Sequence, residues 1–222
     1  MANNLLKGKR GIIFGALNEQ SIAWKVAQRA REEGATFVLT NAPIAMRMGE
    51  ISNLAKETGS EIIPADATSV EDLDNLISKS MDILGGKLDF VLHSIGMSPN
   101  VRKGKHYTEN NYAFYNQSMD VSAISLHKTL ASCYKLDALN EWSSVVALTY
   151  IAAQRIFPDY NDMADAKSLL ESITRSFGYH YGIKKKVRVN TISQSPTVTT
   201  AGQGIKGFTE FKIGRASCRE RV

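Results

Sequence analysis

The sequence is short of cysteine and of long apolar runs, and each shortage excludes a class of protein. Its 222 residues hold two cysteines, Cys133 and Cys218, which form no C-x-x-C pair, and four histidines at irregular spacings. A disulfide framework and a metal site are therefore not expected. No window approaches the roughly 18 consecutive apolar residues of a membrane-spanning helix, and the N-terminus lacks the apolar core of a signal peptide. We expect a cytoplasmic protein that makes no contact with a membrane.

The formal charge of +5 is too small and too unevenly placed to indicate a nucleic-acid partner. Part of it comes from Ile213–Val222, which reads I-G-R-A-S-C-R-E-R-V and carries three Arg against one Glu. This segment has no apolar periodicity and resembles the in-frame translation of a sequencing adapter. We therefore take residues 212–222 as a non-native tail and leave them out of the fold prediction.

Strand and helix patterns alternate regularly along the rest of the chain. Apolar runs typical of buried parallel strands lie at 10–15, 36–40, 61–64, 88–93, 144–149 and 187–192. Helical patterns lie between them, at 22–33, 45–58, 70–84, 118–134 and 160–181. This alternation predicts an α/β fold, a Rossmann-like doubly wound parallel sheet with six strands. We expect one domain over residues 1–211.

Local signals predict how two of these helices begin. Ser21 is expected to cap the first helix, which would bury a face holding Ile22, Val26 and Ala30. Thr68, three residues before a glutamate, has the spacing of a capping box for the helix over 70–84.

The stretch after the fifth predicted strand holds groups suited to chemistry. Tyr150 follows the apolar run, and Tyr160 and Lys167 come next, seven residues apart. Seven residues are nearly two helical turns, so we expect the last two side chains on one face of a helix. Open α/β sheets bind ligands at the strand ends, and a nearby cation would favour phenolate character in a tyrosine. An ordinary surface Tyr and Lys is the alternative interpretation of these residues alone.

The turn after the first predicted strand is a candidate phosphate site. Gly15 ends this strand and the helix pattern begins at Ile22, where dinucleotide folds hold a pyrophosphate on backbone N–H groups. The G-x-G-x-x-G motif is absent, since Ser21 and Ala23 fill its later positions. A tight strand–helix turn explains a single glycine equally well.

Five blocks in a fixed order resemble one family of enzymes. They are Gly15 with Ser21-Ile22-Ala23, Asp66-Ala67, His93-Ser94-Ile95-Gly96, Tyr150 with Tyr160 and Lys167, and Ser193–Ala201. Together they resemble the bacterial NADH-dependent enoyl-acyl-carrier-protein reductases, a divergent branch of the short-chain dehydrogenase/reductase superfamily. The resemblance covers about residues 5–211.

The resemblance implies an NADH site and assigns residues to it. Its cofactor-binding residues would be Gly15, Ser21, Ile22, Asp66, Ala67, Ile95, Gly96, Lys167, Thr197, Thr199 and Thr200. The position where NAD-binding folds often carry an acid for the ribose reads Thr40-Asn41-Ala42 instead. No acid there repels a 2′-phosphate, and Arg47 lies further along, so NADPH stays open beside NADH.

The resemblance also implies the reaction, which is hydride transfer to C3 of a trans-2-enoyl thioester and protonation at C2. Negative charge develops on the thioester oxygen and needs a preorganised donor. Tyr160 would be that donor, Tyr150 would assist it, and Lys167 would orient the cofactor. Ser98, Tyr160 and Ala201 would shape the acyl pocket.

Partners and assembly follow from the same resemblance. It implies an acyl carrier protein as partner, a homotetramer, and a role in fatty acid elongation. Lys206, a few residues past the threonine loop, is the expected carrier contact, with a merely solvated lysine as the alternative. The resemblance also implies a further helix and a final strand beyond residue 211. Without them we expect the chain as it stands to be poorly soluble and nearly inactive.

Two other functions remain open at this point. A carbonyl (3-ketoacyl) reductase of the same superfamily usually pairs Tyr with Lys four residues on and carries Ser at the preceding strand end. Here the interval is seven and Tyr150 occupies that strand end, which argues against it. A dinucleotide-binding regulator without turnover would not need the Tyr160–Lys167 pair.

Overall fold

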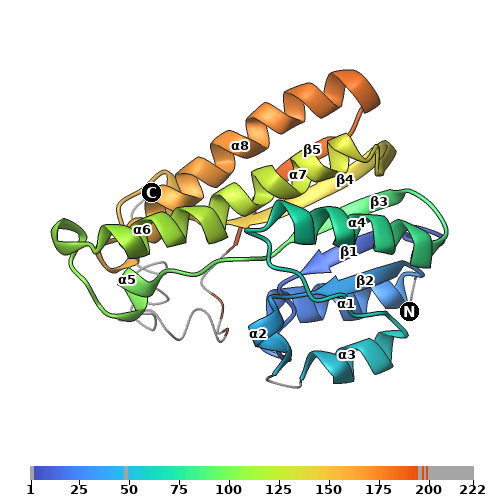
Figure 1. The fold of residues 1–222 in the computed structure, drawn as a ribbon, viewed down its shortest axis with the longest axis horizontal. Helices are drawn as coiled ribbons and strands as arrows, with labels where there is room; N and C mark the ends of the chain where they lie inside the picture. Colours follow the sequence, from blue (N-terminus) through green and yellow to red (C-terminus); the bar gives the residue numbers. More distant parts are fainter. Residues whose placement is uncertain (1–2, 48–49, 195–196, 198, 200–222) are drawn as a thin grey trace, which may run out of the picture.

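The computed structural model describes residues 3–47, 50–194, 197 and 199. The central sheet is built from parallel strands in the order β2-β1-β3-β4-β5. They are β1 (Arg10–Phe14), β2 (Thr36–Thr40), β3 (Leu88–His93), β4 (Leu139–Thr149) and β5 (Arg188–Ser193). Because every pairing is parallel, all five carboxyl ends meet at one edge of the sheet (Figure 1).

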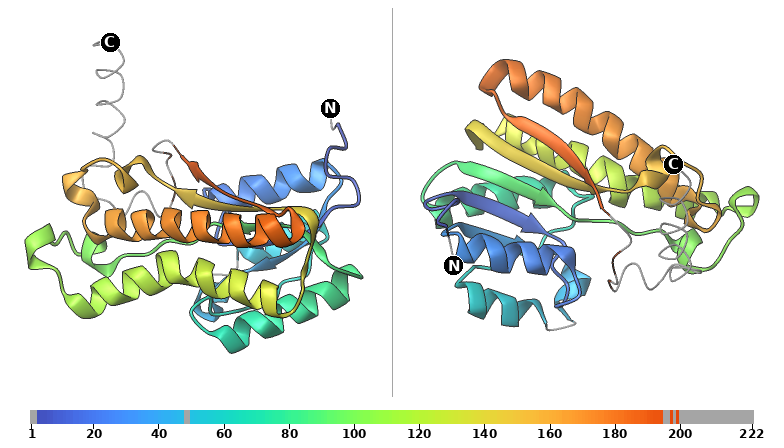
Figure 2. Two further views of the ribbon diagram at one scale, coloured as in Figure 1. Left: turned by 90° about the horizontal axis from the view of Figure 1, so that it is seen from above. Right: turned by 180° about the vertical axis from the view of Figure 1, so that it is seen from behind.

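Helices cover the two faces of the sheet (Figures 1 and 2). One face packs against α4 (Val70–Leu84), α7 (Ser125–Lys135) and α8 (Asp162–Lys185), and the other against α1 (Ile22–Glu32) and α3 (Ile51–Thr58). Side chains alternate along each strand, so Ile12 and Phe14 join the first core while Ile13 joins the second. Each buried side chain of this size contributes about 1.5–3 kcal/mol by leaving water.

Short elements gather beyond the carboxyl edge, where the chain crosses between strands and long helices. The helices among them are α2 (Pro43–Met46), α5 (Pro99–Arg102) and α6 (Tyr112–Met119). The 3-10 turns are η1 (Tyr107–Glu109), η3 (Ile151–Ala153) and η4 (Pro158–Tyr160).

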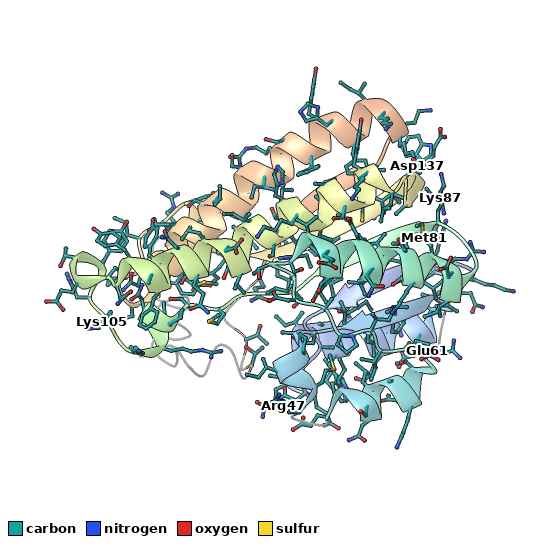
Figure 3. The ribbon with its side chains drawn as sticks, viewed as in Figure 1. Arg47, Glu61, Met81, Lys87, Lys105 and Asp137 are labelled. Atoms are coloured by element: carbon teal, nitrogen blue, oxygen red, sulfur yellow. The ribbon has the colours of Figure 1, made fainter. Side chains whose placement is uncertain are left out.

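Two side-chain ion pairs stabilise the opposite edge of the sheet, where β3 and β4 begin. Asp137 forms ion pairs with Lys185 and Lys87, and the latter lies beside it in Figure 3. Hydrogen bonds from Lys185 and then Lys87 lower the pKa of the Asp137 carboxyl to about 2. The end of α8 is thereby tied to the loop that precedes β4.

The predicted Rossmann-like parallel fold is confirmed, but the strand count is not. The predicted strand over 61–64 is only an isolated bridge, in which Ile62 pairs with Leu39. Pro64 has no N–H to donate, so the ladder cannot continue past it. The described residues therefore hold five strands rather than six. The expected final strand beyond residue 211 and the tail over 212–222 lie outside them.

The predicted buried face of α1 and the predicted cap of α4 are also wrong. The buried face of α1 holds Ala23, Trp24, Ala27 and Ala30, whereas Val26 is exposed. The cap of α4 is Ser69, whose Oγ accepts from Asp72 N at 3.2 Å. The helix begins one residue later than the predicted capping box requires, so the capping position falls to Ser69, while the Thr68 hydroxyl donates to Asp66 Oδ1 at 2.7 Å.

The predicted helix over 118–134 is longer and irregular. It begins with α6, passes through a π-helical turn over Asp120–Ile124, and continues as α7. A π turn inserts one residue and rotates the side chains that follow, and such turns are frequent at functional sites. The side chains of this one reach the carboxyl edge of the sheet, as the next section describes.

No described helix is long and apolar enough to cross a bilayer. Cys133 is a buried free thiol, and burial raises its pKa to about 12. Cys218 lies outside the described residues.

Candidate active site

The turns after the first three strands of the sheet meet at its carboxyl edge around Gly15. Its N–H donates to Thr40 O at 3.1 Å, which joins the turn after β1 to β2. Its φ of +87° is favoured only by glycine, and an added Cβ would lie 2.0 Å from Ser94 O, just after β3. Glycine is thus required here for two separate reasons.

Ser21 closes the turn between β1 and α1 without capping the helix. Its Oγ accepts hydrogen bonds from Leu17 N and Asn18 N, each at 3.1 Å. No side-chain cap bonds to the start of α1, where Ile22 is the first helical residue. The positive end of the helix dipole is therefore left for an anion, as a pyrophosphate site requires.

The predicted catalytic tyrosines lie together in a small cluster of buried side chains. Tyr150 follows β4, and its ring centroid is 5.0 Å from that of Tyr160. Both are 8% exposed, and Met163 and Ala166 of α8 pack in the same cluster.

Tyr160 is not on the helix that carries Lys167, so the prediction of one shared helical face is wrong. Pro158 starts a 3-10 turn that ends at Tyr160, and α8 begins only at Asp162. The residue between them, Asn161, has φ 42° and ψ −137°. Such a conformation costs a residue other than glycine about 1–3 kcal/mol. The helix cannot extend back through it.

Lys167 lies inside the protein beneath Gly96. Its ammonium donates to Leu148 O near the end of β4 at 2.8 Å, and burial lowers its pKa to about 8. A Cβ on Gly96 would lie 3.7 Å from Lys167 Nζ and 3.0 Å from Met163 Cε. Gly96, in the loop after β3, therefore lies directly against Met163 and the Lys167 ammonium.

Burial raises the pKa of the Tyr160 phenol, and neighbouring Tyr150 raises it further. This is opposite to the phenolate character that we expected from a nearby lysine. The phenol consequently stays protonated at neutral pH and can act as a hydrogen-bond donor.

His93, at the end of β3, contributes to the site in a way that the sequence did not indicate. Its Nε2 lies 2.9 Å from Ser125 Oγ, just after the π turn. Burial, and then the charge of Lys167, lower its pKa to about 3, so the ring is neutral. Within the π turn, Ser122 Oγ accepts from Met97 N at 2.9 Å and donates to Met97 O at 3.0 Å. The irregular helix thereby holds the loop that carries Ile95 and Gly96.

The hydroxyl of Ser98 lies in a buried polar cluster and does not face an open pocket. Its Oγ donates to Asp162 Oδ1 at 2.5 Å and accepts from Val101 N at 3.0 Å. Asp162 was not among the predicted site residues. The sequence signal that marks it is a carboxylate at the first position of a helix, directly after the Tyr160-Asn161 turn.

The remaining predicted residues lie at the same edge or beyond the described part of the chain. Asp66 is exposed and Ala67 buried, and Asp66 Oδ1 accepts from Thr68 N at 2.8 Å. Thr197 is exposed and Thr199 half-buried. Thr200 and Ala201 lie outside the described residues, so their predicted roles are not tested.

These residues fit a dinucleotide. Gly15 lets the turns after β1 and β3 come into contact, α1 presents an N-terminus without a side-chain cap, and Lys167 offers a buried cation next to Gly96. Asn41 stands where an acid is common, and its side chain bonds to Ala16 O at 3.5 Å and Ala42 N at 2.9 Å. Arg47 is exposed at the end of α2 (Figure 3).

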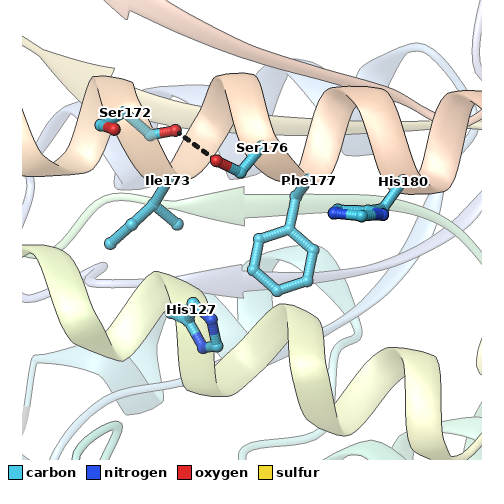
Figure 4. Close-up of a pocket in the computed structure, with 6 residues that line it drawn as sticks. All are labelled: His127, Ser172, Ile173, Ser176, Phe177 and His180. Atoms are coloured by element: carbon cyan, nitrogen blue, oxygen red, sulfur yellow. Dashed lines mark hydrogen bonds between the residues drawn. The ribbon is translucent and has the colours of Figure 1, made fainter.

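A separate cavity of about 220 Å³ lies between α7 and α8. It is lined by His127, Ser172, Ile173, Ser176, Phe177 and His180 (Figure 4). None of the predicted site residues belongs to it.

Comparisons with known proteins agree with this geometry. A family model described as "Enoyl-(Acyl carrier protein) reductase" matches residues 15–218. The enoyl-[acyl-carrier-protein] reductase [NADH] FabI of Rickettsia bellii is 35% identical over 219 residues, 98% of this chain and 81% of that protein. Enoyl-[acyl-carrier-protein] reductase [NADH] 1 of Rhizobium meliloti is 33% identical over 93% of this chain and 75% of its own length. The crystal structure of a FabI–NADH complex from Alistipes finegoldii is 63% identical, with a TM-score of 0.92, and covers 94% of this chain and 74% of that chain.

Proposed function

The chain belongs to the enoyl-(acyl carrier protein) reductase family, and we propose that it reduces trans-2-enoyl thioesters in fatty acid elongation with NADH. The observation that carries this proposal is the buried, packed pair of Tyr150 and Tyr160 at the carboxyl edge of the sheet. The same edge holds buried Lys167 next to Gly96 and the uncapped start of α1 after Gly15. When bound, NADH supplies the hydride that C3 of the substrate takes up.

Tyr160 would stabilise the charge that the reaction creates. As the enolate forms, its negative charge gathers on the thioester oxygen, and a fixed donor there lowers the barrier. The raised pKa of Tyr160 keeps its proton in place for that hydrogen bond. Tyr150 packs against the ring of Tyr160 and limits its movement. Lys167, held at Leu148 O, would bind the ribose hydroxyls of the cofactor.

The experiment is a steady-state assay of NADH oxidation with a short enoyl thioester and, separately, a 3-ketoacyl thioester. Tyr160→Phe should lower kcat for the enoyl substrate roughly 10²–10³-fold, as the loss of one oxyanion donor does. The KM for NADH should stay close to that of the wild type, because Tyr160 is not among the cofactor residues.

Tyr181→Phe is the matched control. Tyr181 is also buried, and its hydroxyl donates to Leu130 O at 3.0 Å, away from the site. It should lose stability without losing kcat. Near-wild-type turnover in Tyr160→Phe would refute the assigned role. Reduction of the keto thioester instead of the enoyl thioester would favour the carbonyl reductase, and no oxidation of NADH with either would favour the regulator.

Acyl carrier protein as the partner, a homotetrameric assembly and a cytoplasmic location are further parts of this proposal. The names of the relatives support the first, because they are reductases of carrier-linked substrates. Lys206, the expected carrier contact, lies outside the described residues.

A further inference from the structure

Asp162 stands at the centre of a hydrogen-bonded cluster that joins three parts of the chain. Its carboxylate is completely buried at the first position of α8. Oδ1 accepts from Ser98 Oγ at 2.5 Å, and Oδ2 lies 2.9 Å from both Asn100 Nδ2 and Ser118 Oγ. The loop after β3, helix α5 and helix α6 are thus fastened to the start of α8, which Figure 1 shows together at one end of the molecule.

The donors in this cluster are themselves held in place. Asn100 bonds twice to the backbone of Asn111, through Oδ1 to its N–H at 3.1 Å and through Nδ2 to its carbonyl at 3.2 Å. Rotating the Asn100 amide would break both bonds. An acceptor is therefore required at Asp162 Oδ2, and a buried polar group without such a partner is costly.

The same cluster borders the strained residue behind Tyr160. Asn161 Oδ1 accepts from Asp162 N at 2.6 Å, and Asn161 Nδ2 donates to Lys105 O at 2.7 Å. A positive φ in a residue other than glycine persists only where its surroundings fix it. The Asn161 side chain is held between Asp162 N and Lys105 O, and Tyr160 is the residue directly before it.

We propose that Asp162 is a positioning residue for the reduction, which holds the Asn161 turn so that the Tyr160 hydroxyl points at the thioester oxygen. The inference rests on the proposed function, because it acts through the role of Tyr160. It adds a buried carboxylate, tied to Ser98, Asn100 and Ser118, that touches neither substrate nor cofactor.

Ser118→Ala is the sharpest test because the fold should tolerate it. Ser118 and Ser80 are both fully buried, and each hydroxyl lies within hydrogen-bond distance of the carbonyl four residues earlier, at 2.9 Å and 2.7 Å. The single O–H of Ser118 has a second acceptor, Asp162 Oδ2 at 2.9 Å, and is shared between the two. We expect Ser118→Ala to lower kcat roughly ten-fold, since small displacements of catalytic groups are costly, with an unchanged KM for NADH. Ser80→Ala should lose comparable thermal stability and keep its kcat.

A double-mutant cycle separates positioning from general damage. In a Tyr160→Phe background, Ser118→Ala should have no further effect on kcat, because the donor that it positions is gone. Asp162→Asn replaces one carboxylate oxygen by an N–H donor and removes the negative charge to which Ser98, Asn100 and Ser118 bond. It should lower kcat more than Ser118→Ala, with a circular dichroism spectrum like that of the wild type.

Each outcome decides one question. Equal kcat in Ser118→Ala and Ser80→Ala, or an undiminished effect of Ser118→Ala in the Tyr160→Phe background, would overturn the positioning role. If Tyr160→Phe alone keeps full turnover, the proposed role of Tyr160 fails first. Should Asp162→Asn not fold, the two serine variants still decide.

Discussion

At the scale of single residues, burial decides the chemistry of the site. Tyr160 and Lys167 are both taken out of water, which keeps the phenol protonated and weakens the hold of the lysine on its proton. From the sequence we expected the charge of Lys167 to lower the pKa of the Tyr160 phenol. The pKa of Tyr160 is instead set by its burial and by Tyr150, and that of Lys167 by its burial. The two side chains therefore act as a neutral donor and a readily discharged cation.

The lowered pKa of Lys167 predicts how cofactor binding depends on pH. Its ordinary value of 10.5 falls to about 8, so the free enzyme loses this charge as the pH rises through about 8. The KM for NADH should therefore rise in alkaline solution, measured by initial rates from about pH 6 to pH 10. Lys167→Arg keeps its charge throughout and should flatten the dependence, with a higher KM because its shape differs.

Lys135→Arg is the control, since Lys135 is exposed and pairs with Asp74. It should leave the pH profile unchanged. The apo protein should also gain stability between about pH 8 and 10.5, where the unfolded chain holds the proton that folded Lys167 has lost. A KM for NADH that is flat with pH in the wild type would contradict the assignment.

At the scale of elements, the turns after β1 and β3 are in such close contact at Gly15 that no side chain fits between them. Gly15→Ala should destabilise the fold and raise the KM for NADH roughly ten-fold or more, because the added carbon displaces the turn from Ser94 O. Gly85→Ala serves as the control, since Gly85 has φ +71° and nothing within 4 Å of an added Cβ. It carries the cost of a left-handed residue, about 1 kcal/mol, without the clash.

Thermal melts and NADH titrations of the two variants make the comparison. If both lose the same stability and keep the same KM, the contact with Ser94 has no role in the cofactor site.

The elements also show what a single sequence can predict. Apolar runs identified β1 to β5 because buried parallel strands need continuous hydrophobicity. They failed at 61–64, where Pro64 stops the ladder. The capping-box spacing was one residue out, since Ser69 rather than Thr68 caps α4. Helical spacing failed at Tyr160, because the positive φ of Asn161 leaves no trace in the apolar pattern. The Asp162 cluster was missed because its partners are 44 to 64 residues away in sequence.

At the scale of the whole molecule, the two faces of the sheet are covered unequally. Val189 of β5 is buried under α8, whereas Ile192, on the opposite face, is 54% exposed. Figure 2 shows β4 and β5 without a described helix on that side. β5 is also the last strand in the described sheet. The prediction of a further helix and strand for complete folding and activity is not tested by these residues.

Surface charge predicts where an acidic carrier protein would dock. Arg102, Lys103 and Lys105 are exposed. Lys105, labelled in Figure 3, lies next to the Asn161 turn, since its carbonyl accepts from Asn161 Nδ2. Lys105→Glu should lower kcat/KM several-fold for carrier-linked substrates, most at low salt, and leave short thioesters unaffected. Lys206→Glu should act in the same direction.

Lys56→Glu on α3, an equally exposed lysine on the other side of the sheet, is the control for net charge. Equal impairment of carrier-linked and short substrates by Lys105→Glu would contradict a docking role.

The ties between residues 98–118 and the start of α8 set an order in which the molecule can assemble. Asn100 and Asp162 are 62 positions apart, and Lys105 and Asn161 are 56. During synthesis, β1, β2 and β3 can pair while the ribosome is still adding the second half of the chain. The Asn161 turn has nothing to hold it until α8 has emerged and met α5 and α6. The junction therefore forms after the pairing of the first three strands, and under the proposed role of Asp162 its loosening would lower activity while those strands stay paired.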